Sequence, residues 1–119
     1  MSATVLSIDE VGQDYPIPLL SRRMVRGEQM LWAHVELKVG CDVAMHQHES
    51  EQIAYVISGR VIWRFGEPDT DEYREQEVAG GTVVHLPGNL PHGVMVIEDS
   101  VILDVLSPPG LMGVDHQDS

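Results

Sequence analysis

The sequence offers little from which a disulfide scaffold, a membrane span or a nucleic-acid surface could be built. Cys41 is the only cysteine, so no disulfide forms within the chain and its side chain is expected to pack at a strand edge. No apolar run approaches the length of a membrane span, and the N-terminus lacks a basic start followed by an apolar run. We therefore expect no membrane partner and a cytoplasmic location.

Basic residues are also scarce. Seven Lys and Arg stand against nineteen Asp and Glu, which gives a formal net charge of −12. Such a charge repels phosphate backbones and anionic lipid surfaces, so nucleic acid is not an expected partner. A small anionic molecule is not excluded, but it would need a local cation to hold it.

Sustained helical periodicity is absent, and short apolar strands take its place. Runs rich in Val, Ile, Leu and Trp recur about every ten residues between turn signals, which predicts an all-β sandwich or small barrel. We expect strands within residues 30–37, 42–48, 52–58, 60–65, 82–87, 92–98 and 101–106. The chain is expected to form one domain over residues 1–119, with an extended segment at 1–20, a barrel at 21–109 and a tail at 110–119.

Histidines are placed where they can converge on one ion. His46 and His48 are two residues apart, so in a strand they project from the same face. Gln52 shares their parity, and His92 follows a Pro/Gly/Asn turn at the start of a later strand. Imidazole and amide oxygen are suitable ligands for Zn, Ni, Fe(II) or Mn(II). By itself, however, a His-x-His pair is a weak signal, since polar residues alternate by chance on solvent-facing strands.

Glycine spacing adds a family resemblance to this pattern. Residues 40–59 read Gly, five residues, His-x-His, three residues, Gln, six residues, Gly, and resemble the first signature of the cupin family, in which Glu usually stands at the Gln52 position. Residues 81–92 resemble the second signature, with Asn89 in place of a glycine; asparagine tolerates the positive φ required there. The resemblance implies a cupin double-stranded β-helix that binds one divalent transition metal per chain through His46, His48, Gln52 and His92.

Three longer segments resemble the small cupins of pectin and alginate breakdown, which convert unsaturated uronates to linear keto-sugars. The segments are SRRMVRGEQMLWAHVELKVG, HQHESEQIAYVISG and VILDVLSPP. The resemblance implies that Asp104 is the catalytic acid/base, and an acidic residue in an apolar run is best explained by a metal cavity. Leu106 and Gly110 stand where that family has a phenylalanine and an arginine. A substrate clamp must then come from elsewhere, with candidates Arg22, Arg23 and Arg64.

The glutamine bears on the choice between functions. A carboxylate ligand cancels one unit of the ion's charge, whereas the amide of Gln52 cancels none. We therefore predict a metal-dependent, redox-neutral enzyme of the isomerase or lyase type that acts on a small oxygen-rich acid, with unsaturated uronates as candidate substrates. A metal-dependent dioxygenase of the same superfamily and a non-catalytic small-molecule-binding cupin are the alternatives.

The other histidines, the aromatic residues and the N-terminal prolines lead to further expectations. His34 is either a cavity contact or a surface residue, His85 is expected at the surface, and Tyr55 is expected to point outward. Trp63 is expected in the core. The prolines of YPIPLLS suit an extended edge segment, and a barrel with open edges needs a cover, so a homodimer is expected.

Overall fold

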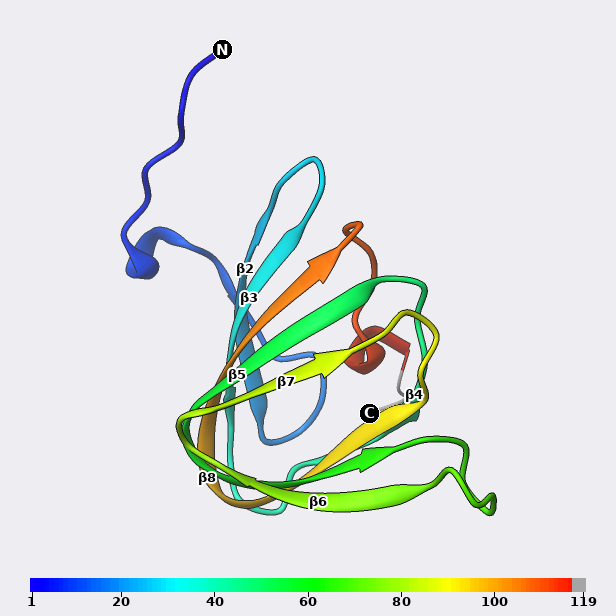
Figure 1. Ribbon diagram of the computed structural model, residues 1–119. Coiled ribbons are helices and arrows are strands. Elements are labelled where there is room, and N and C mark those ends of the chain that lie inside the picture. Colours follow the sequence, from blue (N-terminus) through cyan, green and yellow to red (C-terminus); the bar gives the residue numbers. More distant parts are fainter. Residues whose placement is uncertain (117–119) are drawn as a thin grey trace.

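A computed structural model describes residues 1–116, and it consists almost entirely of antiparallel strands (Figure 1). The strands are β1 (Gln13–Asp14), β2 (Leu20–Arg26), β3 (Leu31–Leu37), β4 (Asp42–His46), β5 (Glu51–Phe65), β6 (Arg74–Ala79), β7 (Thr82–Leu86) and β8 (His92–Ser107). Two short 3₁₀ helices flank them, η1 (Ile8–Glu10) and η2 (Gly113–His116). The all-β prediction is confirmed.

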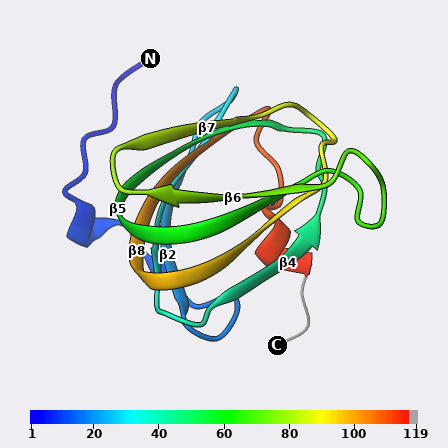
Figure 2. The same ribbon diagram turned by 60° about the horizontal axis from the view of Figure 1, so that its bottom comes forward.

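Two long strands hold the barrel together. β5 and β8 pair with each other over nearly their whole length. Residues 52–56 of β5 also pair with β7, and residues 60–65 pair with β6. In the same way, β8 pairs with β4 near its start and with β3 over residues 100–106. Each long strand therefore passes from one sheet to the other, and the two sheets face each other as in a jelly roll (Figure 2).

A bulge in β5 lets both of its halves face the core. The register with β8 shifts between Val56 and Val61, and Gly59 lies in this bulge with φ +94°. A Cβ on Gly59 would lie 2.2 Å from the Ser100 hydroxyl, so only glycine fits. The bulge moves the buried positions from even to odd numbers: Gln52, Ala54 and Val56 before it, and Val61, Trp63 and Phe65 after it.

The strand predictions need two kinds of correction. Four predicted strands are halves of β5 and β8, because the pairing of these two strands continues across the bulge. β1, β2 and β6 were not predicted. The burial of β2 does not alternate along the strand, and the sequence REQEVA of β6 buries only Val78. Asn89 has φ 65°, as its place in the second signature predicts.

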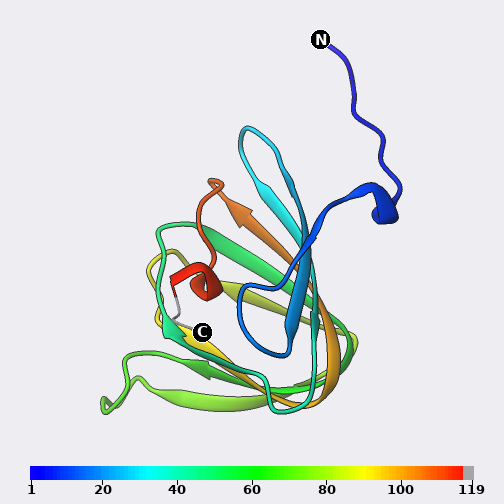
Figure 3. The same cartoon turned by 180° about the vertical axis from the view of Figure 1, so that it is seen from behind.

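The C-terminal residues pack against the barrel, whereas the sequence predicted a tail. Residues 110–116 turn back to the open end of the barrel, where η2 lies beside β4 (Figure 3). Met112 and Val114 are buried there. Their apolar side chains explain the return, because it removes them from water. Residues 117–119 of the expected tail lie outside the described residues.

Helices long and apolar enough to cross a membrane do not occur among residues 1–116.

Candidate metal centre

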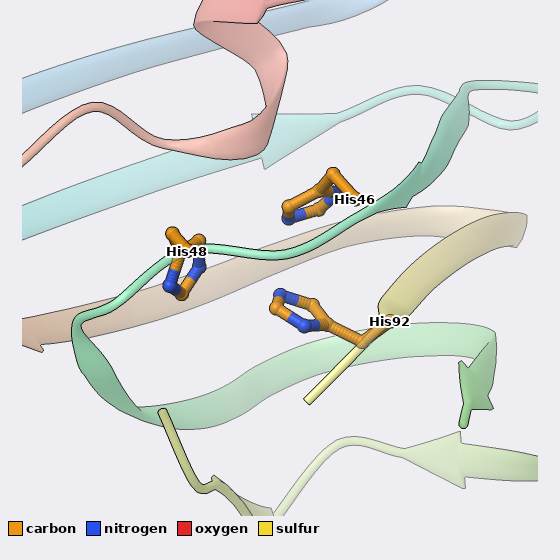
Figure 4. Close-up of side chains that lie close together, drawn as sticks. All are labelled: His46, His48 and His92. Atoms are coloured by element: carbon orange, nitrogen blue, oxygen red, sulfur yellow. The ribbon is translucent and has the colours of Figure 1, made fainter. Parts of the chain in front are cut away.

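Three histidine rings meet at one end of the barrel. His46 is the last residue of β4 and is paired in register with His92, the first residue of β8, while His48 follows in the next turn. Ring centroids lie 4.2 Å apart for His46 and His92, 5.0 Å for His48 and His92, and 5.6 Å for His46 and His48. Their ligand atoms all lie within 4.8 Å of one another, and the rings point toward a common centre (Figure 4). The three histidines can therefore hold one metal ion.

Backbone carbonyls orient all three rings. The Nδ1 atoms of His46, His48 and His92 lie 2.8, 2.9 and 2.8 Å from the carbonyl oxygens of residues 44, 50 and 90. A carbonyl oxygen only accepts, so each Nδ1 carries a proton, and in the neutral ring Nε2 then keeps the lone pair that a metal ion needs. Burial and the neighbouring His46 also lower the pKa of His92 to about 4. The ring of His92 is thus neutral at physiological pH, which is the form that binds a metal.

The amide of Gln52 faces this cluster. Its Nε2 donates to Asp104 Oδ1 at 2.9 Å, which turns its Oε1 toward His48 Nε2 at 3.1 Å. When the His48 ring is neutral with its proton on Nδ1, both facing atoms are acceptors, and no proton lies between them. Two acceptors at this separation repel each other unless a cation lies beside both. The donor set of three imidazole nitrogens and one amide oxygen fits a divalent transition ion.

Asp104 lies on the inner face of β8, beside the Gln52 amide. Its neighbours in register are Ala33 on β3 and Ala54 on β5, both fully buried, which leave space but offer no polar group. Burial raises the pKa of the Asp104 carboxyl to about 7, and the hydrogen bond from Gln52 lowers it only in part. The carboxyl can therefore exchange a proton near neutral pH.

The raised pKa has a measurable effect on the metal-free protein. Native Asp104 holds its proton up to about pH 7, whereas the unfolded chain releases it near 3.8, so the native state binds more protons between these values. The free energy of unfolding of the wild type, relative to Asp104→Asn, is expected to fall as pH rises through this window and to stay level above it. His92 has the opposite effect, since its pKa is lowered, but both proteins share it. Urea unfolding in the presence of a chelator measures the difference; a difference independent of pH contradicts it.

A cavity of about 50 Å³ lies next to the histidines. Its lining includes Gln52, Asp104 and Trp63, whose buried indole N–H has no hydrogen-bond partner among residues 1–116. An unpaired buried donor is costly, and this N–H is an unexplained polar group in the core beside the cavity. The expected core position of Trp63 is correct, but its cavity contact was missed because parity cannot show which part of the core is hollow.

Other predicted residues lie away from the cavity. His34 is on the outer face of β3 beside Trp32, and His85 pairs with Glu51 at 2.6 Å on the surface. Tyr55 points outward, as expected. Among the three candidate arginines, only Arg22 lines the cavity.

Comparison with known proteins agrees with this geometry. Residues 33–107 match the Cupin domain family. The chain belongs to this family. Its fold is therefore the cupin double-stranded β-helix, as predicted, and no curated protein sequence matches it significantly.

Solved structures of other cupins share the fold. KdgF from Halomonas sp. superposes with a TM-score of 0.80 at 21% identity, over 92% of this chain and 96% of that one. An RmlC-like cupin from Shewanella frigidimarina gives 0.79 at 16%, over 91% and 93%. Oxalate decarboxylase from Bacillus subtilis gives 0.76 at 20%, but the match covers 89% of this cupin and only 30% of the decarboxylase. At these identities the likeness concerns the fold.

Proposed function

We propose that this cupin is a metal-dependent, redox-neutral enzyme of the isomerase or lyase type that acts on a small oxygen-rich acid. His46, His48, Gln52 and His92 hold one divalent transition metal, with Zn, Ni, Fe and Mn as candidates, and Asp104 is the acid/base. The observation that carries the proposal is the amide of Gln52, fixed between His48 and the buried Asp104. It joins a set of metal ligands to a group that can move a proton.

The proposed ligand set suits charge stabilisation. Three neutral imidazoles and a neutral amide leave the full charge of a dication in place. Such an ion, when bound, polarises an oxygen atom of a substrate as a Lewis acid. An unsaturated uronate, which carries a carboxylate and several oxygens, is the candidate substrate that follows from the resemblance to uronate-converting cupins.

Protein groups around the cavity supply the remaining functions. Asp104, with a pKa of about 7, can accept a proton from carbon or oxygen and return it at another atom, as enol-to-keto conversion requires. Apolar residues including Val35, Leu37 and Ile102 complete the lining and limit the access of water to the proton transfer.

Turnover assays test this proposal. The metal-loaded protein is expected to convert an unsaturated uronate without uptake of oxygen. The loss of the substrate's ultraviolet absorbance measures the conversion. Oxygen consumption by the Fe(II)-loaded protein in step with product formation would instead establish the dioxygenase alternative. Binding of the acid without any conversion, at every candidate metal, would favour a non-catalytic binding protein.

We also propose a homodimer, supported by apolar side chains on the outer face of the barrel. Ile53 and Ile57 on β5 and Val83 on β7 are 49%, 41% and 63% exposed. The N-terminal segment projects from the barrel and exposes Val5 as well (Figure 1). A second copy can cover both surfaces at once.

Analytical ultracentrifugation tests the dimer. At micromolar concentration the sedimenting species is expected to have twice the chain mass of 13.2 kDa. Ile53→Asp places a charge on the outer face and should shift the species to monomer, whereas Asp69→Asn, on an exposed loop, should not. A wild type that sediments only as a monomer contradicts the proposal.

A further inference from the structure

Arg22 carries a positive charge in the largely apolar wall of the cavity. It lies on the inner face of β2, its side chain is 4% exposed, and it lines the cavity that holds His46 and Asp104. No other Lys or Arg among residues 1–116 lines this cavity. A buried guanidinium is costly without partners, and its planar fork binds carboxylates through two parallel hydrogen bonds.

Two carboxylates occupy two edges of this guanidinium. Asp14 accepts from Nε at 3.0 Å and from Nη2 at 3.2 Å. It belongs to β1 and is paired in register with Arg22, so the strand pairing fixes this partner. Asp115 accepts from Nη1 at 3.0 Å and also from Nη2. It belongs to η2, which follows the turn after β8 and is not part of any sheet.

The segment that carries Asp115 covers part of the cavity, and this arrangement is called the closed form. Met112, Gly113 and Val114 form part of the lining, and a Cβ on Gly113 would lie 2.2 Å from the ring of His46. The Met112 N–H donates to Asp115 Oδ2 at 2.9 Å, so the carboxylate also stabilises the turn itself. The segment thus packs directly on a proposed metal ligand.

The closed cavity is too small for a sugar acid. Its volume is about 50 Å³, whereas an engineered cavity of roughly 150 Å³ is what takes up benzene. β-Strands with paired neighbours form the other walls, so the C-terminal segment is the wall that can move with the loss of fewest hydrogen bonds. A ligand of that size must displace it.

We propose that Arg22 is the carboxylate-binding residue of the cavity, and that Asp115 occupies its Nη1–Nη2 edge until the carboxylate of a small, hydroxyl-rich acid takes that place. The exchange of one carboxylate for another keeps Arg22 paired, whereas a neutral sugar would leave it half-paired in an apolar wall. The ligand class rests on the proposed function, but the exchange itself requires binding only and no turnover.

Calorimetric titration of the protein as purified with D-galacturonate and with neutral D-galactose tests the exchange. Asp115→Asn removes the competing carboxylate and should tighten D-galacturonate binding about tenfold, as expected when the closed form holds roughly nine tenths of the molecules. The matched control is Asp69→Asn, which changes the net charge equally at an exposed loop. Arg22→Lys, introduced into the Asp115→Asn protein, should reverse the gain. Unchanged D-galacturonate affinity, or an equal gain for D-galactose, overturns the proposal.

Hydrogen exchange gives a second test that uses only the wild type. The amides of Met112 and Asp115 are hydrogen-bonded within the closed segment. Saturating D-galacturonate should speed their exchange, while D-galactose at the same concentration should not. Slower exchange with D-galacturonate would show that the acid binds beneath a closed segment, which contradicts displacement. An inactive enzyme that still shows the expected exchange refutes the proposed function and leaves this inference standing.

Discussion

Replacement of His48 by alanine is expected to abolish stoichiometric metal binding. His48 Nε2 faces both the histidine cluster and the amide oxygen of Gln52. The substitution therefore removes one proposed ligand and also the neighbour of a second, Gln52. The affinity for the ion should fall by at least about a hundredfold, since even indirect partners of a metal ligand contribute roughly ten- to a hundredfold. Equilibrium dialysis against a metal buffer measures the change.

His85 provides the matched control. It lies on β7, pairs with Glu51 at the surface, and contributes nothing to the cluster. His85→Ala should bind the ion as the wild type does. If His48→Ala keeps a full complement of metal at unchanged affinity, the site is somewhere else.

Asp104→Asn is expected to separate metal binding from turnover. Asparagine keeps the shape and an oxygen that accepts the hydrogen bond from Gln52, so the ligand set should stay in place. It cannot take up a proton, and turnover of an unsaturated uronate should drop by roughly a hundredfold or more. The rate constant and the metal content are measured on the same preparation.

Two further observations make this test specific. Asp69→Asn, an exposed change of equal charge, should leave the rate unaltered. A general acid/base also governs the pH profile, so the wild-type limb assigned to Asp104 should vanish in Asp104→Asn. An Asp104→Asn protein with the wild-type rate constant would falsify the catalytic role.

Much of the site could be predicted from local rules. Strand parity places His46 and His48 on one face, and the glycine spacing around them adds the family resemblance. Gly59 shows why that spacing matters, since a side chain there would collide with Ser100 and remove the bulge. The apolar run around Asp104 likewise indicated a cavity, because burying a carboxylate without a partner costs free energy.

Long-range packing explains what could not be predicted. Arg22, Arg23 and Arg64 were equivalent candidates in the sequence, and only strand pairing shows that Arg22 faces inward while Arg64 bonds Asp42 at the surface. The closing segment is too short to show periodicity, and its apolar residues Leu111, Met112 and Val114 were the only available signal. Its partners lie on strands far away along the chain, which no local pattern encodes.

The central claim, that His46, His48, Gln52 and His92 form one metal centre, is tested most directly by elemental analysis of protein purified without a metal-affinity tag. The account predicts close to one equivalent of a single divalent transition metal per chain, lost in His48→Ala and kept in Asp104→Asn. Metal-free wild-type protein that also fails to take up zinc, nickel, iron(II) or manganese(II) in dialysis would contradict it.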